Sequence, residues 1–149
     1  MELPVVNHND YEAKLNDDNK FPIKKFGEIA KYLKKNAIVK NFYQPEPCSI
    51  DTLKGAHSEK YIYKIKNKAL SNAEQKKIGF PLVDSVVRRS FVATGGTVLA
   101  TKLALNFGIA CNTAGGSHHA TSDEGAGYCV FNDVAVAAKY LTNRGLANR

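Results

Sequence analysis

The chain has 149 residues, of which 44% are hydrophobic and 23% charged, a composition typical of soluble globular domains. Its length predicts one domain with a buried core, and no apolar run approaches the roughly 18 residues of a membrane span. The net charge is +7, and residues 24–77 contain thirteen lysines against five acidic residues. Because there is no arginine cluster or nucleic-acid motif, we interpret these lysines as a solvated surface. We expect neither a membrane nor a nucleic acid as a partner.

The N-terminal quarter of the chain predicts a strand, a loop and an amphipathic helix. Residues 3–6 are apolar and typical of a short strand, and residues 7–20 are polar. In residues 24–36, apolar side chains recur at helical spacing opposite a lysine-rich face, at Phe26, Ile29, Ala30 and Leu33.

The next segment predicts a second strand and two short helices. Residues 38–43 resemble a strand that ends at the proline-containing segment following it. Ser49 and Ser58 are candidate N-caps, the second of them for a helix over residues 59–66. Residues 69–78 are polar and end at a glycine, and we assign no element to them.

The second half of the chain is much more apolar. Residues 83–106 give the longest helical pattern, and Gly95-Gly96 within it either interrupts the helix or lets another backbone approach closely. Residues 109–112 predict a small buried strand of the parallel type, and residues 134–141 predict an alanine-rich helix. Helices alternating with short apolar strands indicate the α/β class, with a parallel sheet flanked by helices.

Between that strand and that helix lies a glycine-rich loop with two adjacent histidines, His118 and His119. Imidazole changes charge near neutral pH, so one ring can move a proton while its neighbour tunes it electrostatically. A pair of surface or metal-tethering histidines is the alternative. The loop is not a dinucleotide-binding turn, because Val130 stands where a third glycine belongs. Thr94-Gly95-Gly96-Thr97 is not a phosphate loop, because no Gly-Lys-Ser/Thr follows it.

The loop carries a family resemblance. Gly115-Gly116-Ser117-His118-His119-Ala120, followed by Gly127-Tyr128-Cys129-Val130-Phe131-Asn132-Asp133, resembles the histidine-dyad segment of the zinc-dependent histone deacetylases. That family includes the bacterial acetoin-utilisation and acetylpolyamine deacetylases. Shorter pieces fit in the same order: His8-Asn9-Asp10-Tyr11, Phe21-Pro22, His57-Ser58-Glu59-Lys60-Tyr61, Gly79-Phe80-Pro81 and Thr94-Gly95-Gly96-Thr97. The Phe-Pro and Gly-Phe-Pro pieces are most similar to the bacterial and class IV branch.

The resemblance implies an arginase/deacetylase-like fold and hydrolysis of acetyl-lysine, acetylpolyamine-like or related acetyl-amides. His119 then corresponds to the general acid/base and His118 to its electrostatic partner. The backbone carbonyl of Gly127 would meet the substrate, and Tyr128 would line the acyl-lysine tunnel, where phenylalanine is more usual. Ser117 departs from the family, which often has a bulky aromatic before the dyad. Cys129 would lie beneath the site, either as a small buried hydrophobe or with a redox role.

The family's zinc ligands, an Asp-x-His pair and a later aspartate, have no counterpart in this sequence. We expect Asp133 to begin a helix and Asp123-Glu124 to lie in an exposed loop. Residues 1–149 therefore resemble the N-terminal portion of a single deacetylase domain whose C-terminal strands are missing, through a truncated or split gene or an omitted remainder. We expect this chain to be inactive alone, and either to self-associate or to pair with a separately encoded C-terminal part. The alternative is a non-catalytic remnant or interaction module of the same fold.

The cysteines and the N-terminus bear on the cellular compartment. Cys48, Cys111 and Cys129 have no Cys-x-x-Cys spacing, which argues against a cysteine zinc site or a disulfide framework. The first residues lack a basic segment followed by an apolar one. We therefore expect reduced thiols in a cytoplasmic protein.

Overall fold

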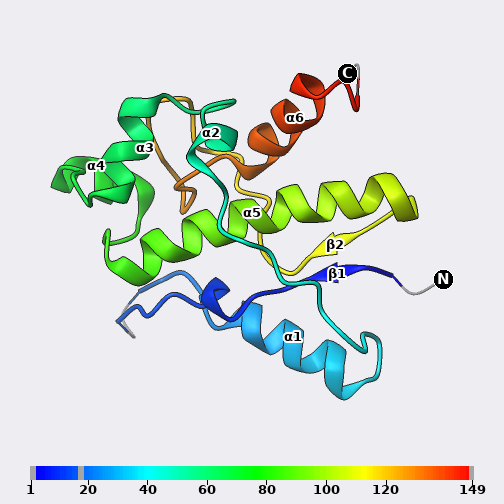
Figure 1. The fold of residues 1–149 in the computed structure, drawn as a ribbon. Coiled ribbons are helices and arrows are strands. Elements are labelled where there is room, and N and C mark those ends of the chain that lie inside the picture. The colour runs from blue at the N-terminus through cyan, green and yellow to red at the C-terminus, as the bar shows by residue number, and fades with distance from the viewer. Residues whose placement is uncertain (1–2, 17–18, 148–149) are drawn as a thin grey trace.

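The computed structural model describes residues 3–16 and 19–147 and is built around one long helix, α5 (Asp84–Phe107). Figure 1 shows α5 crossing the middle of the molecule. Below it in that view lie β1 (Val5–Val6), the short 3-10 helix η1 (Asn9–Tyr11), α1 (Lys25–Lys35) and β2 (Cys111–Asn112). Above it lie α2 (Ile50–Leu53), α3 (Glu59–Lys66), α4 (Asn72–Ile78) and α6 (Asp133–Asn143).

Two hydrophobic clusters flank α5. Val86 and Val98 of α5 belong to the larger cluster, which holds the buried apolar side chains of α3 and α6. Val92 and Ala93 belong to a smaller cluster with Tyr11 and Phe26. A helix that is covered on two sides must be apolar around much of its circumference, which explains the long apolar pattern of this segment. Within the described ranges, no helix combines the length and apolarity needed to cross a membrane.

The paired glycines of α5 do not interrupt the helix, so that expectation is wrong and the alternative of a close approach is confirmed. A Cβ atom at Gly95 would overlap the backbone carbonyl of Glu46. A Cβ atom at Gly96 would overlap the hydroxyl of Tyr11. Tertiary contacts compensate here for the poor intrinsic helix propensity of glycine.

The sheet is small and parallel. Val5 pairs with Cys111 and Val6 with Asn112. The predicted strands at 3–6 and 109–112 are therefore confirmed, as is the α/β class with helices flanking a parallel sheet. The second strand is not buried as expected, because Ile109 is 60% exposed and the side chain of Cys111 is exposed. In residues 3–16 and 19–147, β1 is the only strand that pairs with β2.

The strand expected over residues 38–43 is wrong. The amides of Ile38 and Val39 both donate to the carbonyl of Leu33, so the chain folds back onto the end of α1. These amides therefore complete the last turn of a helix rather than a sheet ladder. Tyr43 alone reaches the sheet, where it forms a single parallel bridge to Val6.

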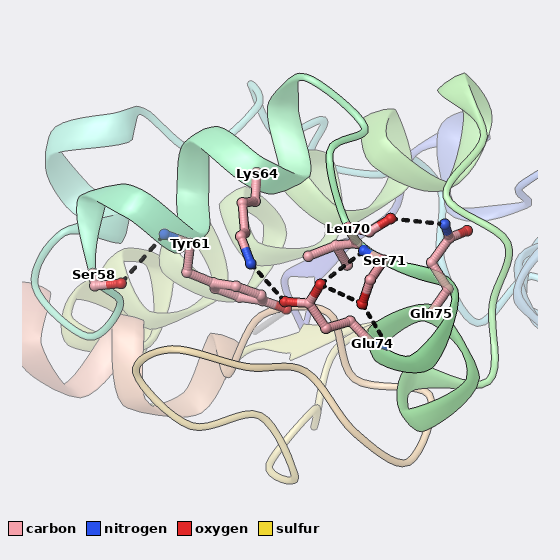
Figure 2. Close-up of polar contacts among 7 residues, drawn as sticks. All are labelled: Ser58, Tyr61, Lys64, Leu70, Ser71, Glu74 and Gln75. Carbon is pink, nitrogen blue, oxygen red and sulfur yellow. Dashed lines mark hydrogen bonds and ion pairs between the residues drawn. The ribbon is translucent and has the colours of Figure 1, made fainter.

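Residues 69–78 contain a helix, α4, that we did not assign (Figure 2). Ser71 and Glu74 form a capping box, in which each side chain accepts a hydrogen bond from the other residue's backbone amide. Lys64 of α3 adds an ion pair to the same carboxylate at 2.8 Å. The Ser-x-x-Glu spacing was the available sequence signal for this helix start. The N-caps predicted at Ser49 and Ser58 are confirmed.

The helix expected over residues 134–141 is confirmed as α6, which begins at Asp133 as predicted. It buries one face against the larger cluster, through Val136 and Ala137. Val134 on another face is 51% exposed. Residues 113–132, which join β2 to this helix, include the two histidines.

Candidate active site

The histidines lie together on the loop between β2 and α6. The ring centroids of His118 and His119 are 4.3 Å apart, with an angle of 36° between the planes. His118 Nδ1 lies 3.0 Å from the carbonyl oxygen of Gly116. Because a carbonyl only accepts, the Nδ1 atom carries the hydrogen, and Nε2 of the neutral ring is left as an acceptor. Both histidines are exposed to solvent, so protons can reach them.

The first turn of α6 holds the backbone that precedes the histidines. Asp133, only 1% exposed, accepts hydrogen bonds from the amides of Gly116 at 3.0 Å and Ser117 at 2.7 Å. The hydroxyl of Thr97 on α5 donates to the same carboxylate. Gly115 allows this approach, because it has a φ of +96° and a Cβ atom there would lie 2.5 Å from Asp133 Oδ2. The buried Asp133 carboxylate and its three hydrogen-bond donors thus fix the backbone just before the two histidines.

Asn132 holds the backbone around and after the histidines. Its Nδ2 donates to the carbonyls of His118 at 3.3 Å and Ala120 at 3.1 Å. Its Oδ1 accepts from the amide of Ala135 and so caps α6. Since the side chain bonds both ways, the helix start and the dyad loop form one hydrogen-bonded unit.

Gly127 lies close to the dyad segment, and the neighbouring Tyr128 packs into a cluster of aromatic rings. A Cβ atom at Gly127 would lie 3.1 Å from the ring of His119, so glycine lets the two segments pack closely. The Tyr128 ring packs against Phe21 and Phe80, with centroid distances of 5.0 and 5.3 Å. Tyr128 has a φ of +65°, and its amide donates to the carbonyl of Ile78 at the end of α4. Tertiary contacts therefore hold Tyr128 in a backbone conformation that is uncommon for residues other than glycine.

A hollow of about 480 Å³ borders Tyr128 on the outside of this cluster. Gly79 and Pro81 line it together with Tyr128, but neither histidine does. Cys129 is buried, and its thiol lies 3.5 Å from the carbonyl oxygen of Gly127, the group that we expect to meet the substrate. All three cysteines are free.

The acidic residues of this region are occupied elsewhere. Glu124 pairs with Lys77, Asp123 accepts from Ser122, and both belong to the exposed loop that we predicted for them. Asp133 is committed to the three donors described above. In the part of the chain that the structure describes, no group of three or more histidine, cysteine, aspartate or glutamate side chains could hold a metal ion. These residues do not fit a zinc site by themselves, since a catalytic zinc typically has three protein ligands.

The comparisons with known proteins identify a family and a fold. The family model described as the histone deacetylase domain matches residues 20–149. A protein of Picosynechococcus sp. without an assigned activity is 38% identical over the whole chain, which spans 50% of that protein. Histone deacetylase 2 of Arabidopsis thaliana is 33% identical over 80% of the chain and 33% of that protein. The crystal structure of an HDAC homolog from Aquifex aeolicus superposes with a TM-score of 0.80 at 22% identity, covering 97% of this chain and 42% of that one.

The chain therefore belongs to the histone deacetylase family, and it has the arginase/deacetylase-like fold that the resemblance implied. It spans half or less of the length of these relatives. Its small parallel sheet with flanking helices corresponds to only part of the complete fold.

The sequence pattern singles out His118 and His119 as candidates, but not the residues that hold their loop. The sequence indicates Asp133 only as a helix start and points to no supporting role for Asn132 or Thr97. The Asn-Asp pair before an alanine-rich helix does signal a cap. Nothing in the pattern shows that the Asp133 carboxylate also accepts from the amide of Ser117, or that the Asn132 side chain donates to the carbonyl of Ala120, because both contacts require the tertiary fold.

Proposed function

We propose that this chain supplies the histidine-dyad part of a zinc-dependent deacetylase that hydrolyses acetyl-lysine or related acetyl-amides, including acetylpolyamine-like substrates. The observation that supports this most strongly is the paired rings of His118 and His119 on a loop held by Asn132 and Asp133. Family membership supports the reaction class. Residues 1–149 would then form the N-terminal portion of one deacetylase domain.

In this proposal the two histidines have different tasks. His119 takes a proton from the attacking water and later gives it to the leaving amine. His118 stays next to it as the electrostatic partner, with its Nδ1 hydrogen directed at the Gly116 carbonyl. The carbonyl of Gly127 accepts from the substrate amide, and the ring of Tyr128 packs against the acyl-lysine methylenes. The close packing of Gly127 on His119 supports placing substrate and base together.

The proposal includes a second component. The zinc of the family would need ligands that the described residues of this chain do not supply, so we expect the isolated chain to hold no tight stoichiometric zinc and to be inactive alone. The exposed Leu105, Phe107 and Ile109 come just before β2 in the chain, and in the described residues β2 has a partner strand on one side only, so an added strand could pair with it. We infer that this surface pairs with the remaining part of a deacetylase domain or with a second copy of the chain. A cytoplasmic location fits the three free cysteines.

The test compares the chain alone with a version joined to the C-terminal part of the Picosynechococcus relative. Both are dialysed, analysed for zinc and assayed with acetyl-lysine and acetylpolyamine reporters. Only the completed version should bind zinc and turn over. His119→Ala should lower its rate by roughly 10²-fold or more, the scale of general acid/base catalysis.

Thr121→Ser, a conservative change at an exposed position of the same loop, is the matched control and should leave the rate unchanged. A folded, zinc-loaded and active version that is indifferent to His119→Ala would refute the assigned role. A folded completed version without activity towards any acetyl-amide would favour the non-catalytic alternative.

A further inference from the structure

His57 is a buried histidine outside the dyad. It lies just before α3, is 3% exposed, and packs against the rings of Tyr61 and Phe131, at centroid distances of 5.7 and 5.2 Å. Aromatic packing alone would make it an ordinary core residue. Its hydrogen bonding shows more than packing.

The Nε2 atom of His57 accepts the backbone N–H of Asn132 at 2.9 Å. This nitrogen must therefore be unprotonated, and the hydrogen of the neutral ring sits on Nδ1. The Nδ1 atom is buried and has no hydrogen-bond partner within residues 3–16 and 19–147. A buried polar atom without a partner is costly, so the Nε2 contact is the interaction that accounts for a histidine at this position.

The contact reaches the dyad through Asn132. The same residue whose amide is held by His57 donates its side-chain N–H groups to the carbonyls of His118 and Ala120. These carbonyls flank His119 in the chain. A shift of the Asn132 backbone therefore moves the two groups that fix the backbone around the proposed acid/base.

Two further hydrogen bonds join the segment around His57 to the dyad loop. The hydroxyl of Tyr61 donates to the carbonyl of Val130 at 2.7 Å, two residues before Asn132. The amide of Ser58 donates to the carbonyl of Ser122 at 2.9 Å, beyond the dyad. The segment from His57 to Tyr61 thus holds the loop on both sides of its histidines.

We propose that His57 is a positioning residue for the histidine dyad, with its unprotonated Nε2 holding Asn132 and, through Asn132, the backbone at His118 and Ala120. Its relevance to catalysis rests on the proposed function, but the positioning itself does not. The chain then contains three histidines in one unit, two of them exposed on the loop and one buried as its support.

Protonation of His57 would break this support. A hydrogen on Nε2 would face the Asn132 N–H, so the acceptor would be replaced by a second donor. Burial lowers the pKa of His57 below its ordinary value. Contacts of the ring with the backbone of Ser122 and Thr121, which do not meet hydrogen-bond geometry, and the carboxylate of Asp123 act in the opposite direction. The Tyr61 hydroxyl, the other titratable group facing the ring, stays neutral because burial raises its pKa.

The experiment is a pH titration of the ¹⁵N-labelled chain followed by NMR. The His57 ring should titrate below pH 6.5, and the amides of Asn132 and Ala120 should shift with the same midpoint. The protection factor of the Asn132 amide, which is its intrinsic exchange rate divided by its observed rate, should fall roughly threefold to tenfold as the pH is lowered through that midpoint, as expected for loss of one hydrogen bond. Because no activity is measured, this outcome is independent of whether the proposed function is correct.

Two substitutions extend the test. His57→Gln keeps an acceptor near the position of Nε2 and should remove the shared midpoint while preserving the loop spectrum. His57→Leu removes the acceptor and should perturb Asn132 and the His118 and His119 ring signals at every pH. His8→Gln is the matched control, since His8 Nδ1 accepts from the amide of Asp10 within its own segment and this bond does not reach the dyad loop.

The proposal would be overturned if the chemical shifts of the dyad-loop amides in the wild-type chain did not change when His57 is protonated. That titration needs no variant, so a failure of His57→Leu to fold leaves the test intact. A His57→Leu chain that folds with an unchanged loop spectrum would also overturn it.

Discussion

Replacing Asp133 by alanine should destabilise the chain far more than a usual surface mutation. The carboxylate is 1% exposed and accepts from two backbone amides and one hydroxyl. Hydrogen bonds to charged groups contribute about 1.5–3 kcal/mol each. These contributions do not simply add, because the three donors have different alternatives after the carboxylate is removed.

The structure allows each donor to be weighed. The hydroxyl of Thr97 also reaches the carbonyl of Ala93 at 3.4 Å, so it retains an acceptor. Gly116 is exposed, so water can replace part of its bond, but the amide of Ser117 is less accessible. We therefore expect Asp133→Ala to lower the free energy of unfolding by about 2–4 kcal/mol. Asp133→Asn keeps one acceptor oxygen and should cost about half as much.

The assay is urea unfolding followed by circular dichroism, at several chain concentrations so that association does not distort the result. Asp84→Ala is the matched control, because Asp84 is likewise the first residue of a helix but its side chain is 88% exposed. Asp84→Ala removes a surface ion pair with Lys68 and a favourable interaction with the helix dipole. Together these should lower the free energy of unfolding by less than about 1 kcal/mol. Equal effects of the two alanine substitutions would refute the view that Asp133 anchors the dyad loop.

The other stability predictions concern a glycine and a helix cap. Gly95→Ala should destabilise α5 by about 1–3 kcal/mol, although alanine favours helices, because the new Cβ would overlap the Glu46 carbonyl. Gly27→Ala in α1 is the control and should be neutral or stabilising, because its Cβ would meet only the end of a flexible glutamate side chain. The opposite order of stabilities in urea unfolding would contradict this prediction. Glu74 has its pKa lowered from 4.5 to about 2, first by the hydrogen bond from Lys64, so its stabilisation is complete above pH 4.5 and is lost as the pH falls towards 2. Glu74→Gln should flatten the acid side of a stability-against-pH curve, and an unchanged curve would show that the capping box contributes nothing to it.

The sequence by itself determined the local structure and the family. Helix periodicity located α1, α5 and α6, and serine caps marked the starts of α2 and α3, because these signals depend on neighbours within one or two turns. The dyad segment led to the histone deacetylase family, which the match over residues 20–149 bears out. The capping box of α4 was also a local signal and should have been recognised.

Only the tertiary structure decided which residues support the dyad. Gly95-Gly96 became a contact surface because Glu46 and Tyr11, which are distant in sequence, pack against it. The amides of Ile38 and Val39 bond instead to the nearby Leu33 at the end of α1, which the apolar pattern of residues 38–43 does not reveal. Asp133 reads locally as a helix start, yet its carboxylate also holds the loop that begins after β2. Likewise His57 is 75 residues from Asn132, and no periodic pattern encodes a hydrogen bond across that separation, since it exists only once α3 and α6 pack into the same core.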